Sequence, residues 1–251
     1  MMAANYRVMK DAEAFYFAGN EIGVLVVHGF TGTTQSMRYI GEQFAAEGFT
    51  VLGPRLEGHG TDPEDMEAST HQDWIDNVEA GLATLKEECS KLFVAGLSMG
   101  GTLTLYLAEQ HPEINGILPI NAAVDIPEMA ENYRELAKTD TRFVNGIGSD
   151  IKRSGIKELA YEKTPVKSMG EIVTLTEKVK QNLSNITTPV LIFSSKEDHV
   201  VPPENSQLIY DSVSSTEKTL FPLEASYHVA TLDNDKEVIA NKAIQFIKAN
   251  C

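Results

Sequence analysis

A serine lies at the centre of residues 96–100, which read Gly-Leu-Ser-Met-Gly. The preceding run, 91–97, is apolar and rich in branched and aromatic residues, and the run 102–110 suits a helix. Ser98 is therefore predicted at a sharp turn between a strand and a helix, with glycines flanking it where a side chain would collide. A five-residue match of this kind can arise by chance and is weak evidence alone. Its position between a predicted strand and a predicted helix is what predicts a nucleophile elbow.

A serine hydroxyl is a poor nucleophile until a base takes its proton, and the base needs an acid to hold its tautomer. In elbow-type hydrolases the chain order is serine, acid, histidine, so both partners of Ser98 must follow it. Asp198 lies just past the apolar run 189–194, and His228 follows the last predicted strand. We predict that Asp198 orients His228 and that His228 activates Ser98.

Alternatives exist for both partners. Glu197 and Asp211 compete with Asp198 as the acid, and His199 is an alternative base. Three other histidines occupy strand-end loops or a helix end and are expected to be structural: His28, His59 and His111.

Acyl transfer also needs two N–H donors for the oxyanion. The first is expected at the start of the helix after the nucleophile, on the backbone of Met99. The second is expected in the loop after the first strong strand, on the backbone of Phe30. Both roles belong to the main chain, so these two side chains affect only access to the site.

Composition limits the partners. The chain has 251 residues, of which 42% are hydrophobic and 23% charged, as in ordinary globular proteins. The 21 basic and 36 acidic residues give a formal charge of −15, which repels nucleic acid and anionic lipid surfaces. A small-molecule partner, no nucleic-acid partner and no stable membrane insertion are expected.

The small number of cysteines and the lack of a targeting signal predict the compartment of the protein. Cys89 and Cys251 are the two cysteines, too few for a disulfide framework or a metal-ligand cluster. The first residues lack a signal-peptide core, and no 18-residue apolar run occurs later. Zinc-protease, Walker and dinucleotide-binding motifs are missing as well. We expect a cytoplasmic protein without cofactor or metal.

Strands and helices alternate along the chain, which predicts an α/β fold with a mostly parallel sheet and helices on both faces. The expected strands are 22–28, 49–52, 91–97, 116–120, 189–194 and 218–221, and the expected helices are 36–47, 74–88, 102–110, 171–183 and 236–248. Residues 200–213 are expected to form a loop followed by a helix. Residues 62–67 are expected to form a solvated loop.

The stretch from about 123 to 170 is too long for a single crossover and is predicted to be a cap over the active site within one domain, 1–251. Short helical pieces are expected at 127–138 and 157–163.

The segments 28–32, 96–101, 197–202 and 226–231, together with cap segments 148–150 and 157–165, resemble the monoacylglycerol lipases of bacilli. These belong to the α/β-hydrolase superfamily and are close to small thermostable carboxylesterases. The resemblance runs along essentially the whole chain, with residues 128–141 least similar. It implies an α/β-hydrolase fold and hydrolysis of monoacylglycerols to fatty acid and glycerol, with little action on di- and triacylglycerols.

The same resemblance implies site residues. Its triad falls on Ser98, Asp198 and His228, and its oxyanion donors fall on Phe30 and Met99. Its glycerol-binding positions fall on Ile147 and Glu158. A carboxylate can accept hydrogen bonds from both free hydroxyls of a monoglyceride, and a diglyceride has lost one.

The sequence thus predicts a serine esterase that acts on a lipid ester, as a monomer or weak homo-oligomer. A general carboxylesterase for short- to medium-chain esters is the nearer alternative. A non-catalytic binding protein that kept the hydrolase pocket is the alternative from another class.

Overall fold

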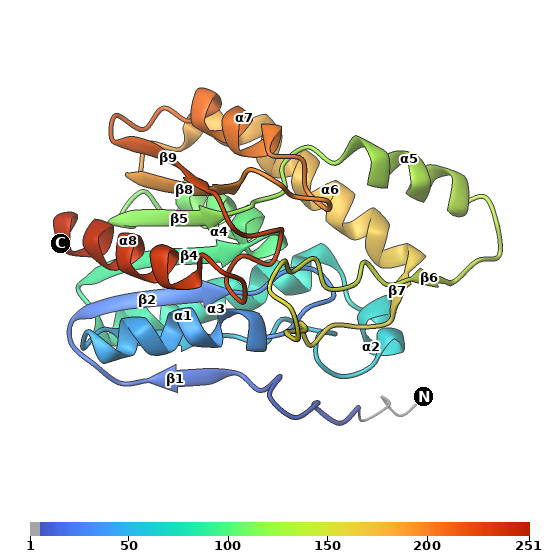
Figure 1. The fold of residues 1–251 in the computed structure, drawn as a ribbon, viewed down its shortest axis with the longest axis horizontal. Coiled ribbons are helices and arrows are strands. Elements are labelled where there is room, and N and C mark those ends of the chain that lie inside the picture. Colours follow the sequence, from blue (N-terminus) through green and yellow to red (C-terminus); the bar gives the residue numbers. More distant parts are fainter. Residues whose placement is uncertain (1–5) are drawn as a thin grey trace.

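One seven-stranded sheet forms the centre of the protein (Figure 1). The computed structural model describes residues 6–251. The strand order is β1-β3-β2-β4-β5-β8-β9; β1 pairs antiparallel with β3, and the other neighbours are parallel. The strands are β1 (Phe15–Phe17), β2 (Ile22–Val27), β3 (Thr50–Gly53), β4 (Lys91–Leu97), β5 (Gly116–Ile120), β8 (Val190–Ser195) and β9 (Lys218–Leu223).

Helices cover both faces of this sheet (Figure 1). Helices α1 and α8 pack on one face, and α3, α4, α6 and α7 pack on the other. The predicted mostly parallel sheet with two helical layers is thereby confirmed. The helices are α1 (Gln35–Ala46), α2 (Pro63–Ala68), α3 (His71–Glu88), α4 (Met99–Gln110), α5 (Pro127–Leu136), α6 (Val166–Asn182), α7 (Glu204–Ser212) and α8 (Lys236–Ala249), with a 3-10 turn at Leu183–Asn185.

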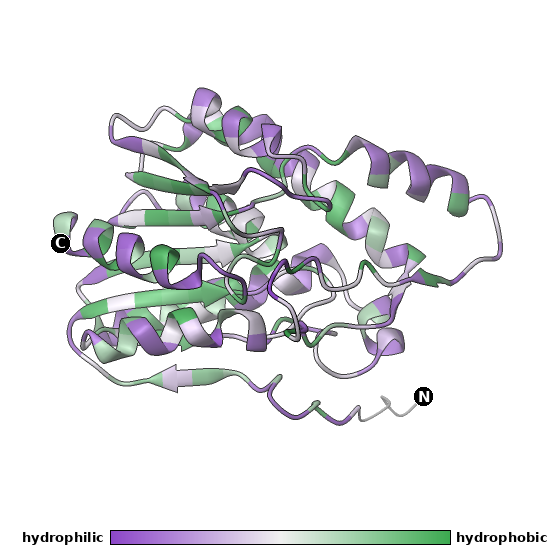
Figure 2. Ribbon diagram, viewed as in Figure 1, coloured by the Kyte–Doolittle hydropathy of each residue, from purple (hydrophilic) through white to green (hydrophobic). Residues whose placement is uncertain are grey.

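The pleat of each strand divides the core. In β2, Val24 and Val26 face the α1/α8 layer, whereas Leu25 and Val27 face the α3/α4 layer. Side chains of a strand point alternately to its two faces, and both faces are covered here, so the strand is apolar throughout. Figure 2 shows the central strands as hydrophobic, whereas α5, outside the sheet layers, is mostly hydrophilic.

Several local predictions were wrong. Residues 62–67 are not a loop, because Asp62 caps the N-terminus of α2 by accepting a hydrogen bond from Glu64 N–H, and Pro63 suits the first helical position. Helix α3 begins at His71 rather than Trp74, where Thr70 and Asp73 form a capping box. The edge strand β1 was not predicted.

The long connection between β5 and α6 holds α5 and a small two-stranded sheet, β6 (Phe143–Asn145) and β7 (Lys163–Pro165). Figure 1 shows α5 lying along α6. The helix expected at 157–163 is absent from this described stretch, which is irregular until β7 begins. Helix α6 begins at Val166, earlier than the predicted residue 171.

None of the helices in the described range has the length and apolarity needed to cross a bilayer.

Candidate active site

Ser98 occupies the sharp turn between β4 and α4. Its backbone has φ 56° and ψ −119°, a conformation that side-chain-bearing residues rarely adopt. The turn is held on both sides, because Ser98 N–H donates to the Ile120 carbonyl at 2.9 Å and Thr102 N–H donates to the Ser98 carbonyl at 3.1 Å. The serine is 9% exposed.

The two flanking glycines permit this turn. A Cβ atom on Gly96 would collide with the backbone of Gly100. A Cβ atom on Gly100 would collide with the β2 end, including the His28 carbonyl oxygen at 2.6 Å. Strand β2 and helix α4 can therefore approach the turn closely only where both positions lack side chains.

Two loops at the carboxyl edge of the sheet bring an acid and a histidine together. The acid loop (residues 196–203) follows β8, and the base loop (residues 224–235) follows β9. Asp198 Oδ2 lies 2.8 Å from His228 Nδ1, and both side chains are nearly fully buried. The other oxygen of Asp198 accepts hydrogen bonds from Val200 and Val201 N–H at 2.9 and 2.8 Å. Asp198 is thus held in place by the backbone, and its contact with Nδ1 leaves Nε2 as the other ring nitrogen of His228.

The alternative partners lie elsewhere. His199 is half-exposed and its Nδ1 lies 2.8 Å from Asp150 Oδ1, which raises the pKa of His199. Glu197 pairs with Lys152 at 3.0 Å on the surface. Asp211 accepts a hydrogen bond from Gln207.

Interior side chains support the base loop from below. Asn121 follows β5 in a left-handed conformation, φ 45°, and its Nδ2 donates to the His228 carbonyl at 2.7 Å. Ser195 Oγ accepts from the same amide and donates to the Tyr227 carbonyl at 2.8 Å. These contacts fix the backbone on which the histidine is mounted.

The geometry of His28 orients one proposed oxyanion donor. His28 Nε2 accepts from Leu56 N–H at 3.2 Å, so the ring proton resides on Nδ1 and is donated to the Gly29 carbonyl at 3.0 Å. Burial lowers the pKa of His28 to about 4, which keeps this ring neutral. In a trans peptide the carbonyl and the following N–H point in opposite directions, so fixing the Gly29 carbonyl also fixes Phe30 N–H.

The other proposed donor opens helix α4. Met99 is the first helical residue, and a first-turn N–H has no carbonyl partner within its own helix. Both Phe30 and Met99 side chains are buried in the core layer that holds Trp74.

His59, expected to be structural, packs edge-on against Trp74 with ring centroids 5.6 Å apart. Burial lowers the pKa of His59 to about 3.

A cavity of about 30 Å³ is lined by Ser98, His228 and Phe30. It brings the two cap residues of the prediction, Ile147 and Glu158, into the same space as Ser98 and His228. Its lining residues are Gly29, Phe30, Thr31, Leu97, Ser98, Ile147, Gly148, Glu158, Val200, His228 and Val229.

Glu158 is held from two directions. The Gln35 side chain accepts from Leu159 N–H at 3.0 Å and donates to the Lys157 carbonyl at 3.3 Å, one residue either side of Glu158. Ser149 Oγ accepts from Glu158 N–H at 2.9 Å. The carboxyl group lies against Gly32, where an added Cβ would be 2.6 Å from Oε1. The Glu158 residue is partly exposed, and it lines the cavity beside Ser98 and His228.

Burial raises the pKa of Glu158 from 4.5 to about 7, although the charge of His228 opposes the shift. The folded protein therefore binds this proton more tightly than the unfolded chain, and the free energy of unfolding falls as pH rises from 4.5 to about 7. Glu158→Gln carries no titrating proton. At about pH 8 we expect it to be more stable than the wild type by about 1–3 kcal/mol, a difference that should vanish near about pH 4.5. Thermal unfolding of both proteins across this range checks the prediction; equal pH dependence would contradict it.

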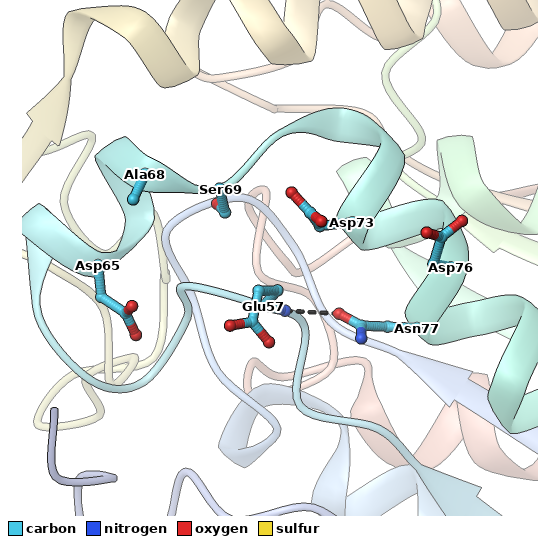
Figure 3. A pocket seen from close by; sticks show the side chains of 7 residues that line it. All are labelled: Glu57, Asp65, Ala68, Ser69, Asp73, Asp76 and Asn77. Carbon is cyan, nitrogen blue, oxygen red and sulfur yellow. Dashed lines mark hydrogen bonds between the residues drawn. The ribbon is translucent and has the colours of Figure 1, made fainter. Parts of the chain in front are cut away.

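A separate pocket of about 290 Å³ lies beside α2 and α3 (Figure 3). Figure 3 shows carboxylates around it and the hydrogen bond from Glu57 N–H to Asn77 Oδ1, which measures 2.6 Å. Its lining residues differ from those of the serine cavity, and Asp73 is already engaged in the capping box of α3. Within residues 6–251, no group of three or more His, Cys, Asp or Glu residues is placed to hold a metal ion.

The chain is similar to known lipases and esterases. The family model described as "Serine aminopeptidase, S33" matches residues 20–235. The chain is 52% identical over 245 residues to the thermostable monoacylglycerol lipase of Bacillus sp. (strain H-257), covering 98% of each. It is 31% identical to a carboxylesterase of Bacillus subtilis (strain 168), covering 93% of this chain and 95% of the relative. A solved structure of a metagenome-derived lipolytic enzyme superposes with a TM-score of 0.92 at 48% identity, covering 97% of this chain and 100% of the other.

Proposed function

The chain belongs to the serine aminopeptidase S33 family and has the α/β-hydrolase fold, and from that premise we propose that it hydrolyses monoacylglycerols to fatty acid and glycerol through an acyl-enzyme. It is a carboxylic ester hydrolase. The observation that carries the substrate assignment is the Glu158 carboxyl group, which lines the same cavity as Ser98 and His228.

In the proposed first half-reaction, His228 Nε2 takes the Ser98 proton as Oγ attacks the ester carbonyl carbon. The Phe30 and Met99 N–H groups donate to the resulting oxyanion. When the tetrahedral intermediate collapses, the bond to glycerol breaks and His228 delivers its proton to the departing oxygen. Asp198 holds His228 in the required tautomer and stabilises its cationic form throughout.

In the second half-reaction, water takes the place of glycerol. His228 Nε2 accepts a proton from this water as its oxygen attacks the acyl carbon. The second tetrahedral intermediate expels Ser98 Oγ, which recovers the proton from His228, and the fatty acid leaves. No proton or electron is left over, so we propose turnover without a cofactor.

Glu158 and Ile147 are the proposed glycerol-binding residues. A carboxyl group can bind both free hydroxyls of a monoglyceride, whereas a diglyceride presents one, and a buried polar group left unpaired costs about 1–3 kcal/mol. Ile147 is 39% exposed and contributes an apolar wall at the mouth of the cavity. The proposed selectivity therefore depends on the leaving group.

A substrate panel tests this assignment. We expect kcat/KM to fall in the order mono-, di-, triacylglycerol, and Glu158→Ala to lower kcat/KM for monoolein by about 10–100-fold through the loss of one or two hydrogen bonds. The same variant should leave p-nitrophenyl esters, which lack glycerol, within about twofold. Gly32→Ala keeps the carboxyl group but displaces it, and should share the loss on monoolein.

A general carboxylesterase is the second candidate, because the chain is also similar to the Bacillus subtilis carboxylesterase. That function predicts equal effects of Glu158→Ala on monoolein and on p-nitrophenyl esters of the same chain length. Such a result would overturn the glycerol role and leave the serine chemistry intact.

We further propose that the stretch predicted as a cap, about 123–170, acts as one; because α6 already begins at Val166, it corresponds to the β5–α6 connection, residues 121–165. A cavity of about 30 Å³ is much smaller than an acyl chain, so we propose that part of this connection moves when the acyl chain enters. Each chain supplies every proposed catalytic group, which suits a monomer or weak homo-oligomer.

We propose the cytoplasm as the compartment. Cys89 and Cys251 are free thiols, as suits a reducing environment.

A further inference from the structure

Asp150 connects the β5–α6 connection to both loops that carry the proposed acid and base. Its Oδ2 accepts hydrogen bonds from His228 N–H and His199 N–H, each at 3.1 Å. Its Oδ1 lies 2.8 Å from His199 Nδ1, and its carbonyl accepts from Val229 N–H at 3.1 Å. One carboxylate therefore bonds the backbone of the base itself and that of the residue directly after Asp198.

The surrounding contacts make this link rigid. Asp233, in the base loop and fully buried, accepts from Lys152 N–H at 2.6 Å and from Arg153 N–H at 2.9 Å. It also accepts from Tyr227 N–H at 2.9 Å. Figure 1 shows this part of the connection, in yellow, beside the red loop that precedes α8. Two carboxylates thus join residues 150–153 to the base loop through main-chain donors on both sides.

Asp150 itself is charged and largely enclosed. The Asp150 side chain is 15% exposed. Burial opposes its charge, yet the hydrogen bonds from His199 and from the His228 backbone outweigh burial and lower the pKa of Asp150. The carboxylate oxygens accept bonds from N–H groups that have no other acceptor among the hydrogen bonds of residues 6–251.

We propose that Asp150 is a positioning residue, whose carboxylate sets the separation between the acid loop and the base loop. The inference rests on the proposed function, since it takes Asp198 and His228 as the catalytic acid and base. Because a misplacement of about 1 Å can cost about 10²-fold in rate, a lost Asp150 acceptor should lower kcat while substrate affinity is kept.

Two variants distinguish the effect of where the Asp150 oxygens lie from the effect of their charge. Asp150→Asn keeps an oxygen at the place that serves both backbone donors, and its NH₂ can donate to neutral His199. Asp150→Glu keeps the charge but moves the oxygens by one methylene. We expect kcat of Asp150→Asn to stay within about threefold of the wild type, kcat of Asp150→Glu and Asp150→Ala to fall by about 10–100-fold, and KM to change by less than about threefold in each.

The matched control is Lys152→Ala. It breaks an exposed ion pair to Glu197 that joins the β5–α6 connection to the acid loop, and such surface pairs contribute little to stability, so kcat should stay within about twofold. The downfield proton resonance of the His228–Asp198 hydrogen bond should persist in Asp150→Asn and shift or broaden in Asp150→Glu.

Several outcomes decide the matter. If Asp150→Glu matched or exceeded Asp150→Asn in kcat, charge rather than position would matter and the proposal would be overturned. Wild-type kcat with only a lowered Tm in Asp150→Glu would also overturn it. If Asp150→Ala did not fold, the Asn and Glu variants, which keep an acceptor and a similar volume, decide alone. Hydrolysis that survived Ser98→Ala would refute the proposed function instead, so the two failures are distinguishable.

Discussion

Ser98→Ala is expected to lower kcat on monoacylglycerols by at least about 10⁴-fold, because the acyl-enzyme can no longer form. Alanine has the same Cβ and the same difficulty with φ 56°, so the fold should survive and Tm should change little. Steady-state hydrolysis of monoolein and covalent labelling by a fluorophosphonate measure the effect. Both should be lost together.

Ser168→Ala is the control for this variant. Ser168 is fully buried and lies on α6, where its Oγ donates to the Met66 carbonyl at 3.1 Å. Labelling and turnover should be retained there. Turnover within about tenfold of the wild type in Ser98→Ala would refute the nucleophile assignment.

Asp198→Asn is expected to lower kcat by about 10³–10⁴-fold while the fold stays intact. The asparagine oxygen can still accept from Val200 and Val201 N–H, which turns its NH₂ group toward His228 Nδ1. An NH₂ group donates, so His228 would carry its proton on Nε2, the nitrogen that must accept the serine proton. The variant therefore stabilises the wrong tautomer.

Rates of monoolein hydrolysis and of fluorophosphonate labelling, with Tm as a check on folding, test the Asp198→Asn prediction. Glu197→Gln is the neighbouring control, since Glu197 is half-exposed and pairs with Lys152 on the surface. Its activity should match the wild type. Equal losses in the two variants would mean that the acid loop tolerates no change, and the orienting role of Asp198 would have to be abandoned.

Local sequence patterns predicted the central fold and the positions of the serine, acid and histidine. Ser98, Asp198 and His228 each follow an apolar run, and the ends of parallel strands lie at one edge of a sheet, so sequence order already implies their proximity. The short helix α2 was missed although Asp62 and Pro63 are a recognisable helix start. The apolar anchors and charges of 157–163 suggested a helix, but the Gln35 side chain bonds the backbone on both sides of Glu158, and the stretch is irregular until β7 begins.

The supporting contacts could not be predicted in the same way. The hydrogen bond from His228 to Asp150 joins residues 78 apart in sequence, and that from Leu159 to Gln35 joins residues 124 apart. Such bonds depend on how an irregular connection folds back over the sheet, and hydrophobic periodicity carries no record of it. Glu158 entered the prediction only through resemblance, since a charged residue in a polar stretch looks like any solvated one.

The backbone of Ser98 has a consequence for how this protein can change over generations. A non-glycine residue at φ 56°, ψ −119° costs about 1–3 kcal/mol, which the surrounding hydrogen bonds must offset. Glycine would relieve that strain, losing only about 0.4–1 kcal/mol through a more flexible unfolded chain. Folding therefore disfavours serine at this position, and the proposed role as nucleophile gives a reason for keeping it. If that role holds, a lineage released from the need to hydrolyse esters would gain stability by replacing this serine with glycine.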